Sequence, residues 1–285
     1  MKTSRVLGTD RIALVTGASR GIGPLIAREI AREGNHVVLT GRSPEELQAV
    51  AYDLRDKGAD VSFLPTNLVQ PWAAEALVQT VERERGGIDL LVNNAGGDPQ
   101  REFDRMTLNE NLDILQLNLV APLTLSHSML GGMLQRRRGH IVNISALAGR
   151  VAFPFTEAYA AAKDGLIGFT RVLRNDYRGR GVSASVLILG PIRGAGQGQR
   201  TAAQLGLKLP PFATESADTV ARAVIDAIKR DRAEVVMMPG PGRLVKAAMD
   251  YFPGLGPAIT RISGSTATMQ RVIEYRRGQE HAAVS

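Results

Sequence analysis

The chain of 285 residues contains no cysteine and no long apolar run. The lack of thiols excludes disulfides, thiolate nucleophiles and cysteine-ligated metal, and we expect no metal site. No stretch approaches the roughly 18 apolar residues that cross a bilayer, and residues 1–11 lack the apolar region of a signal peptide. We therefore expect a cytoplasmic protein without a transmembrane segment.

Aromatic residues are also scarce, at 5%, and the basic residues behind the net charge of +7 are scattered. A basic surface attracts polyanions, but the one tight run, Arg136 to Arg138, precedes Gly139 at a predicted helix end, where cations complement the helix dipole. We favour that interpretation over a nucleic-acid patch and expect no nucleic-acid partner. The hydrophobic content of 44% and the charged content of 22% are those of an ordinary globular protein.

Short apolar, β-branched runs alternate with longer helical patterns along most of the chain. Strand followed by helix, repeated, predicts a parallel sheet with helices on both faces and a ligand site at the carboxyl ends of its strands. We therefore expect one Rossmann-like, doubly wound α/β domain over residues 1–240. The predicted strands are Ile12–Thr16, His36–Thr40, Val61–Leu64, Ile88–Val92, His140–Ile144, Val182–Leu189 and Glu234–Met237, with helices beginning near Pro24, Pro44, Pro71, Thr107, Glu157 and Ser216.

Two segments interrupt this alternation. Residues 190–215 are rich in glycine, proline, glutamine and alanine, a composition that suits a mobile lid over a site. Residues 241–285 form a C-terminal extension, in which apolar positions between Leu244 and Phe252 predict a short amphipathic helix that ends at Pro253. We favour a helix that packs on the domain over one that contacts a membrane or a partner protein.

A glycine-rich segment lies between the first predicted strand and the first predicted helix. Glycines allow a tight turn and a close approach of the backbone to a pyrophosphate, whose charge is favoured at a helix N-terminus. A turn without a ligand has the same composition, but its placement after the first strand favours dinucleotide binding. The candidate cofactor-binding residues in this segment are Gly17, Ser19, Arg20, Gly21, Ile22 and Gly23.

The second predicted strand ends at Gly41 and Arg42, where NAD-binding folds usually place an acidic residue on the ribose hydroxyls. Because no carboxylate stands there to repel it, we expect a 2′-phosphate to be held by Arg42 and by Arg20. Either arginine is otherwise an ordinary solvated surface residue. The pair favours NADP(H) over NAD as the cofactor.

Tyr159 and Lys163 stand one helical turn apart, so that backbone geometry holds a phenol and an ammonium on one face. The ammonium favours the phenolate and is expected to lower the pKa of Tyr159 from its usual value near ~10. A tyrosine tuned in this way exchanges a proton with a substrate oxygen near neutral pH. Taken alone, such a pair is common on solvated helix faces, so the rest of the chain decides its meaning.

Several motifs occur together in one order: the glycine-rich segment, Asn93 to Gly96 after the fourth strand, Asn118 in a long helix, and Tyr159 with Lys163. Over residues 10–240 this set resembles the short-chain dehydrogenase/reductase family. The resemblance implies a single Rossmann-like domain with a seven-stranded parallel sheet, a small-molecule substrate, and a homodimer or homotetramer. It also favours a chemical role for the tyrosine.

The resemblance assigns roles to individual residues. Tyr159 would be the general acid that protonates a carbonyl oxygen as hydride arrives from the nicotinamide. Lys163 would bind the nicotinamide ribose and depress the pKa of the tyrosine, and Asn118 would hold a water in a proton relay. The further cofactor contacts that it implies are Asn67, which replaces the family's usual aspartate near the adenine, together with Leu68, Asn94, Ala95, Gly96, Gly190, Pro191 and Ile192.

One position departs from the family pattern at the reacting end of the site. The family's serine, which binds the substrate oxygen, aligns with Ala146, and Ser145 stands one residue early. Adjacent side chains of a strand point to opposite faces, so Ser145 replaces the serine only with a bulge or a shifted register. Loss of such a donor costs catalysis roughly two to three powers of ten, which disfavours simple ketones as substrates.

Two hypotheses follow. The first is an NADP(H)-dependent reductase that transfers hydride to an apolar carbonyl or to a conjugated enone, quinone or imine, with Tyr159 as general acid and base. Val151, Phe153 and Phe155 would line an apolar pocket, although core packing explains them equally well. The second is an NADP(H)-binding regulatory or scaffold protein with little turnover. Retention of both Tyr159 and Lys163 favours the enzyme, since binding alone needs no tuned phenol.

Overall fold

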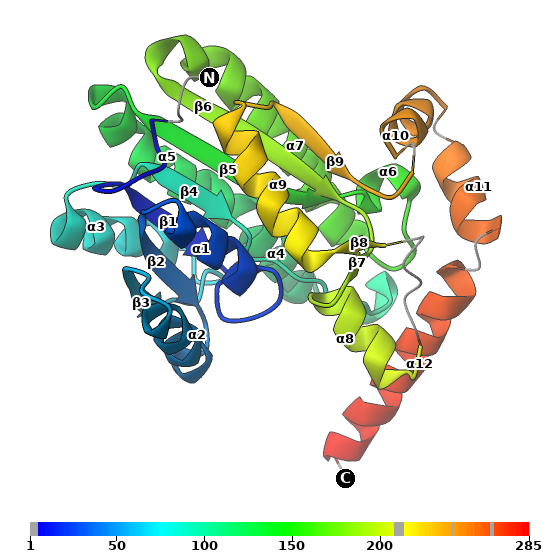
Figure 1. Cartoon of the computed structure of the whole chain (residues 1–285). Coiled ribbons are helices and arrows are strands. Elements are labelled where there is room, and N and C mark those ends of the chain that lie inside the picture. The colour runs from blue at the N-terminus through cyan, green and yellow to red at the C-terminus, as the bar shows by residue number, and fades with distance from the viewer. Residues whose placement is uncertain (1–4, 208–213, 241, 253, 263–264, 285) are drawn as a thin grey trace.

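The computed structural model describes residues 5–207, 214–240, 242–252, 254–262 and 265–284. Within these residues, seven parallel strands form one sheet in the order β3-β2-β1-β4-β5-β6-β9 (Figure 1). This order, with helices on both faces, confirms the predicted Rossmann-like fold. The strands are β1 (Ile12–Thr16), β2 (His36–Gly41), β3 (Val61–Pro65), β4 (Leu90–Asn93), β5 (Gly139–Ala146), β6 (Val182–Leu189) and β9 (Glu234–Met237).

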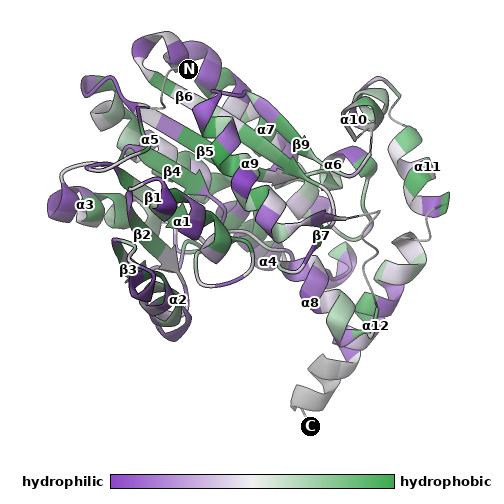
Figure 2. Ribbon diagram, viewed as in Figure 1, coloured by the Kyte–Doolittle hydropathy of each residue, from purple (hydrophilic) through white to green (hydrophobic). Residues whose placement is uncertain are grey.

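The sheet lies between two layers of helices, each with its own apolar cluster (Figures 1 and 2). Side chains alternate along each strand, so Ala13 and Val15 of β1 join one cluster while Leu14 joins the other. The first layer consists of α1 (Gly23–Arg32), α2 (Pro44–Asp56) and α9 (Ala217–Lys229), and the second of α3 (Ala73–Arg85), α5 (Ala121–Gln135) and α7 (Glu157–Tyr177).

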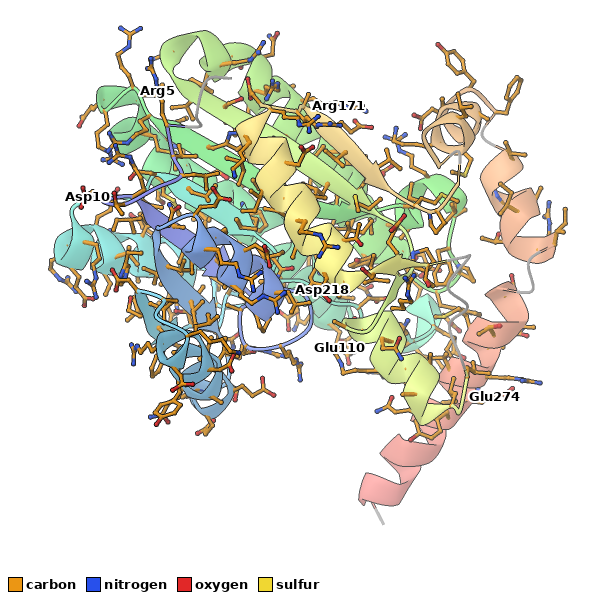
Figure 3. All side chains as sticks on the ribbon, viewed as in Figure 1. Arg5, Asp10, Glu110, Arg171, Asp218 and Glu274 are labelled. Atoms are coloured by element: carbon orange, nitrogen blue, oxygen red, sulfur yellow. The ribbon has the colours of Figure 1, made fainter. Side chains whose placement is uncertain are left out.

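Polar contacts fix where these helices begin and how they pair. Arg28 of α1 forms an ion pair at 2.7 Å with Asp218 of α9, which is labelled in Figure 3. The pair joins two helices of one layer. The helix α4 (Leu108–Leu115) begins with a capping box, in which the Thr107 side chain accepts from the Glu110 backbone and Glu110 accepts from the Thr107 backbone. The turn η1 (Phe103–Arg105) precedes this helix.

A π-helical segment, η2 (Gln116–Val120), joins α4 to α5 and contains Asn118. The long helix predicted from Thr107 is therefore interrupted at the residue that sequence motifs single out. Single π-helical turns frequently occur at functional sites, because the extra residue turns a side chain away from the regular helical face.

The segment predicted as a lid, residues 190–215, contains regular structure rather than loop alone. It holds the short strand β7 (Ile192–Arg193), which pairs with β8 (Glu215–Ser216), and between them the helix α8 (Gln197–Gln204). Residues 208–213 of the predicted lid lie outside the described residues. Composition alone missed the helix, because the glycines and prolines of this segment are poor helix formers and outweigh its glutamines and alanines, which are good ones.

The C-terminal extension is more elaborate than the single short helix expected from the sequence. Its described part forms α10 (Gly242–Tyr251), α11 (Leu255–Ile262) and α12 (Ser265–Val284), shown in orange and red in Figure 1. Helices α10 and α11 contact the short helix α6 (Ala148–Val151), and a side chain at Gly256 would meet the Arg150 carbonyl oxygen at 2.5 Å. The extension therefore packs on the domain beside the β5–α7 connection.

The apolar face predicted for this extension was wrong in part. Met249 is buried, but Leu244, Tyr251 and Phe252 are among the most exposed large apolar side chains of the described chain. Lys246 of the same helix is buried instead, and it forms ion pairs with Asp250 and with Glu234 of β9. Among the described residues, we find no helix that is both long enough and apolar enough to span a bilayer.

Candidate active site

The glycine-rich segment between β1 and α1 packs too tightly for side chains. A Cβ atom at Gly17, whose φ is +64°, would lie 2.8 Å from the Ala95 Cα atom, and one at Gly23 would lie 2.0 Å from the Gly17 carbonyl oxygen. Gly21 also adopts a positive φ, of +72°. Glycine is thus required both for the turn and for the close packing of α1 on the loop, as a pyrophosphate-binding turn demands.

The segment after β4 is joined to this turn by hydrogen bonds. The Thr16 hydroxyl accepts from the backbone N–H groups of Asn94 and Ala95 at 3.0 and 2.9 Å. The Asn94 side chain donates to the carbonyl oxygens of Thr16 and Gly17 at 2.9 and 3.1 Å. The predicted residues Asn94 and Ala95 therefore hold the glycine loop in place.

Three arginines come from segments next to the glycine loop. Arg20 lies within the loop, and Arg42 follows Gly41, where an added Cβ atom would lie 3.3 Å from the Ser19 Oγ atom. Arg20 and Arg42 are both exposed, which leaves their guanidinium groups available to an anion. Sequence reasoning missed the third, Arg200 of α8, whose pKa is lowered by burial and by the positive charge of Arg20. A Cβ atom at Gly21 would lie 3.6 Å from Gly196, so the segment leading into α8 lies against the glycine loop. This cluster suits a phosphate group.

The remaining predicted cofactor residues lie at the same edge of the sheet, but they differ in whether a side chain or only the backbone is available to a ligand. Asn67 is exposed and its side chain accepts the Val69 N–H group at 3.3 Å, whereas the Leu68 side chain is buried in the core. Leu68 thus has only its backbone to offer. Gly190, Pro191 and Ile192 follow β6, where the Gly190 N–H group donates to the Met237 carbonyl oxygen.

Tyr159 and Lys163 lie in the first turns of α7, as their spacing predicts. The Lys163 ammonium is 5.5 Å from the centre of the Tyr159 ring and donates to the Ile144 carbonyl oxygen at 3.0 Å. The lysine is 4% exposed, so the carbonyl is a partner that helps to hold a charged group in the interior. The two side chains are thus positioned together at the end of β5.

The pKa values differ from the sequence-based expectation. Burial raises the pKa of Tyr159 well above its usual value, and the nearby negative charge of Asp98 raises it further. Burial lowers the pKa of Lys163 to about 8. The prediction that Lys163 depresses the tyrosine pKa is therefore wrong for the protein alone, since loss of hydration outweighs the ammonium. The phenol keeps its proton, which is the form that a proton donor requires.

Asn118 is fully buried, and its side chain forms hydrogen bonds with backbone groups nearby. Its Nδ2 donates to the carbonyl oxygens of Gly97 and Ile114, each at 2.9 Å, and its Oδ1 accepts the Gly97 N–H group at 3.2 Å. A Cβ atom at Gly96 would lie 2.6 Å from this Oδ1 and 3.1 Å from the Lys163 Nζ. The Asn118 side chain therefore fixes residues 96–97 beside Lys163, and both Nδ2 hydrogens are taken, so they are not available to hold a relay water.

Ser145 and Ala146 occupy consecutive positions at the end of β5. The Ser145 hydroxyl is buried and donates to the Lys163 carbonyl oxygen at 2.8 Å. The register is regular, with Ser145 opposite Ile188 and Ala146 opposite Leu189, and so contains neither the bulge nor the slip that would exchange their faces. The Ser145 side chain thus points toward α7, and the Ala146 side chain points to the opposite face of the sheet.

The apolar residues ahead of Tyr159 differ in how they pack. Val151 packs against the buried cluster of Leu147, Ile167, Val186 and Ile188. Phe153 and Phe155 are half-buried, and Phe155 has a positive φ of +59° in the connection to α7. Core packing therefore accounts for Val151.

Sequence reasoning missed a second set of residues beside Tyr159. Asp98 follows Gly96 and Gly97 directly, Gln197 comes from α8, and Arg276 comes from α12. Gln197 Oε1 accepts the Asp98 N–H group at 3.1 Å, and Arg276 Nη2 donates to the Gln100 side chain at 2.9 Å. The one available signal was the position of Asp98, two residues beyond a recognised motif.

Known proteins resemble the chain over most of its length. A family model described as short chain dehydrogenase matches residues 11–205. The ketoacyl reductase HetN of Nostoc sp. (strain PCC 7120) is 35% identical over 233 residues, which cover 82% of this chain and 80% of that protein. The 3-oxoacyl-[acyl-carrier-protein] reductase FabG of Escherichia coli (strain K12) is 37% identical over 180 residues, or 63% of this chain and 72% of that protein.

Solved structures resemble the fold as well. A metagenomic short-chain oxidoreductase in complex with NADP superimposes with a TM-score of 0.70 at 32% identity, covering 82% of this chain and 99% of that one. A single-substitution variant of the actinorhodin polyketide ketoreductase with NADPH gives a TM-score of 0.74 at 26% identity, covering 83% and 99%. Together with the family match over the glycine loop and the Tyr159 and Lys163 pair, these similarities establish that the chain belongs to the short chain dehydrogenase family.

Proposed function

We propose that this protein is an NADP(H)-dependent reductase that transfers hydride to an apolar carbonyl or conjugated substrate, with Tyr159 as the proton donor. The observation that carries the proposal is the placement of Tyr159 and Lys163, one helical turn apart in α7, beside Gly96 at the carboxyl end of the sheet. Binding of a nucleotide alone requires no phenol and ammonium at that place.

The residues present fit an NADP(H) molecule. Because Gly17 and Gly23 have no Cβ atoms, which would clash with Ala95 and with Gly17 itself, the β1–α1 turn packs tightly. A turn of this kind suits a pyrophosphate bound at the N-terminus of α1. The exposed guanidinium groups of Arg20 and Arg42 suit a 2′-phosphate, and no acidic residue occupies the end of β2. The solved relatives in complex with NADP and NADPH support the same choice of cofactor.

Each residue of the site then has a physical role. When bound, the cofactor supplies a hydride to the substrate carbon. Tyr159 keeps its proton at neutral pH because burial and Asp98 raise the pKa of its phenol, and it donates that proton to the substrate oxygen. Lys163 stabilises the phenolate that remains, since its ammonium lies 5.5 Å from the ring centre. Asn118 positions Gly96 and Gly97 next to both groups.

The substrate class follows from Ala146. With the Ser145 hydroxyl bound to the Lys163 carbonyl oxygen, β5 offers the substrate oxygen no serine donor. Substrates that develop less charge on oxygen, such as enones, quinones and imines, suffer less from this loss than simple ketones do. The names of the relatives, ketoacyl and 3-oxoacyl reductases, support a carbonyl attached to an apolar chain as a further member of the panel.

The test begins with binding of NADPH and NADH, measured by the change in nicotinamide fluorescence on titration with the purified protein. A panel of cyclohexanone, an enone, a quinone, a cyclic imine and a 3-oxoacyl thioester is then assayed for loss of NADPH absorbance. The proposal expects tighter binding of NADPH than of NADH and turnover of at least one class. Binding without turnover across the panel would instead support an NADP(H)-binding regulatory or scaffold protein.

A further inference from the structure

Arg200 is an exposed residue of α8, and its guanidinium group forms no ion pair with any of the described residues. Arg20 in the glycine loop and Arg42 after β2 share both properties. By contrast, Arg28 and Arg32 of α1 each form an ion pair with a carboxylate at 2.7 Å. Three guanidinium groups from different segments are therefore available to an anion that comes from outside the protein.

The backbone that leads into α8 lies against the glycine loop. A Cβ atom at Gly21 would lie 3.6 Å from the Gly196 Cα atom and 3.7 Å from its backbone nitrogen. The Arg200 N–H group donates to the Gly196 carbonyl oxygen at 3.2 Å, which places the arginine one helical turn beyond this contact. Helix α8 thus starts beside the glycine loop, and Arg200 lies in the turn that follows.

A neighbouring face of α8 is held by other segments. Gln197 accepts the Asp98 N–H group at 3.1 Å, and the Thr201 hydroxyl donates to the Gln100 side chain at 3.3 Å. Arg276 of α12 donates to the same hydroxyl at 3.4 Å, so α8 lies beside α12 (Figure 1). Gln197 and Thr201 are four residues apart and share one face of the helix. These contacts set how α8 is rotated about its axis.

The Arg200 side chain is directed toward the glycine loop. Gly196 and Arg200 are also four residues apart, and side chains of an α-helix point toward its N-terminus and cover the preceding turn. The charges nearby agree with this direction. Partial burial and the positive charge of Arg20 lower the pKa of Arg200, whereas Glu46 in the first turn of α2 raises it. Arg200 therefore lies near both the glycine loop and the start of α2.

These two segments meet at the end of β2, where the cofactor's 2′-phosphate is expected. A Cβ atom at Gly41 would lie 3.3 Å from the Ser19 Oγ atom, so the last residue of β2 adjoins the glycine loop. Arg42 follows directly. A phosphate dianion bound between like charges reduces the repulsion between them, and each guanidinium gives it charge-assisted hydrogen bonds.

We propose that Arg200 is a specificity-determining residue that binds the 2′-phosphate of NADP(H), together with Arg20 and Arg42. The inference deepens the proposed function and rests on it only for the identity of the cofactor. Arg200 belongs to the segment whose composition suits a lid, so a residue of this segment takes part in the choice between NADP(H) and NAD(H). Arg276 holds the adjacent Thr201, which connects the C-terminal extension to the same place.

The first test measures the affinities of NADPH and NADH by fluorescence titration. Arg200→Gln removes the charge but keeps a good helix former, so α8 should be preserved. We expect NADPH to bind about 10- to 100-fold more weakly, as loss of a hydrogen bond to a charged group does, and the affinity of NADH to change by less than about twofold. Arg200→Lys keeps the charge without the planar fork and should recover part of the loss. Arg85→Gln, at an exposed position of α3, is the matched control and should alter neither affinity.

The second test separates this inference from the reductase. Adenosine 2′,5′-bisphosphate and adenosine 5′-monophosphate differ only in the 2′-phosphate and carry no nicotinamide, so calorimetric titration measures the phosphate contact without the reaction. We expect Arg200→Gln to weaken binding of the bisphosphate by about 10- to 100-fold and to leave the monophosphate nearly unchanged. This result would support the inference even if the protein reduced no substrate, an outcome that would reject only the reductase.

Three results would overturn the inference. An NADPH/NADH affinity ratio that is the same in Arg200→Gln and in the unaltered protein would show that Arg200 does not bind the 2′-phosphate. Equal weakening of both nucleotides would place its contact on the pyrophosphate instead. If the unaltered protein itself bound NADH as tightly as NADPH, the proposed cofactor would be rejected together with the inference.

Discussion

The Ser145 hydroxyl donates to the Lys163 carbonyl oxygen at 2.8 Å, so the serine nearest to Tyr159 along β5 serves the backbone of α7. The side chain of the next residue, Ala146, points to the opposite face of the sheet. The proton donor of the proposed reaction is therefore present while a second hydrogen bond to the substrate oxygen from β5 is missing.

Restoring that hydrogen bond should change the substrate range. We expect Ala146→Ser to raise kcat/KM for simple ketones such as cyclohexanone by about 100-fold, because a well-placed donor to a developing oxyanion contributes two to three powers of ten. Rates with quinones should change much less. Steady-state NADPH oxidation with both substrate classes measures the difference.

The matched control is Ser145→Ala, one residue earlier. It removes a buried hydrogen bond and should lower the free energy of unfolding by about 1 kcal/mol without the selective effect on ketones. If Ala146→Ser left ketone rates unchanged, the missing donor would not be what limits this enzyme.

Replacement of Arg42 should change the choice of cofactor. Arg42→Asp places a carboxylate at the end of β2, where it repels a 2′-phosphate and accepts from ribose hydroxyls, so the NADPH/NADH affinity ratio should fall by roughly 100-fold. Fluorescence titration with each nucleotide measures the ratio. Arg85→Asp, the same charge reversal at an exposed position in α3, should leave it unaltered. If the NADPH/NADH affinity ratio were the same in Arg42→Asp and in the unaltered protein, the assignment of NADP(H) as the cofactor would be wrong.

We expect Lys163 to take part in catalysis but to lower the free energy of unfolding. Burial lowers the pKa of Lys163 from 10.5 to about 8, so the charged side chain destabilises the fold at neutral pH by about 3 kcal/mol. Its hydrogen bond to the Ile144 carbonyl oxygen offsets only about 1 kcal/mol of this. We expect Lys163→Met to abolish reduction and to raise the free energy of unfolding by about 1 to 2 kcal/mol in urea titrations. The gain should shrink as the pH rises from 8 toward 10.5, where the lysine is neutral in the folded state. A less stable Lys163→Met at neutral pH would show that the ammonium stabilises the fold.

His140 should make the fold sensitive to acid. Burial lowers its pKa from 6.5 to about 4, so between these values the unfolded chain binds a proton that the folded chain does not. Stability is thus lost as the pH falls through 6.5, by up to about 3 kcal/mol at pH 4. Asp98, whose pKa is raised, contributes with the opposite sign, so a variant is needed to isolate the histidine.

The comparison uses His140→Asn and, as control, His127→Asn at an exposed position. We expect thermal melts at a series of pH values to show a smaller acid-induced loss in His140→Asn alone. Parallel pH dependences in His140→Asn and the unaltered protein would mean that another group is responsible.

The parts of the site that the sequence predicted are those fixed by local geometry. Tyr159 and Lys163 are neighbours because any helix brings residues four apart together, and Gly17 and Gly23 pack as they do because one strand runs into one helix. The parallel sheet followed from the alternation of strand and helix, since right-handed crossovers leave few topologies.

What the sequence could not predict depends on contacts between distant segments. Arg276 meets Pro99 across 177 residues, and Gln197 meets Asp98 across 99 residues, so neither pair leaves a local pattern. The pKa of Tyr159 was predicted in the wrong direction for a related reason. The lysine stands only four residues from the tyrosine in sequence, but the burial that dominates the shift of the Tyr159 pKa arises from the whole fold.

The central claim is that Tyr159 donates the proton in an NADPH-dependent reduction, and Tyr159→Phe tests it most directly. The phenylalanine preserves the ring beside Lys163 and removes the hydroxyl alone. For the best substrate of the panel, we predict that kcat falls by at least about a hundredfold, as loss of a general acid does, while the NADPH affinity measured by fluorescence stays the same. Retention of full turnover with bound NADPH would contradict the account.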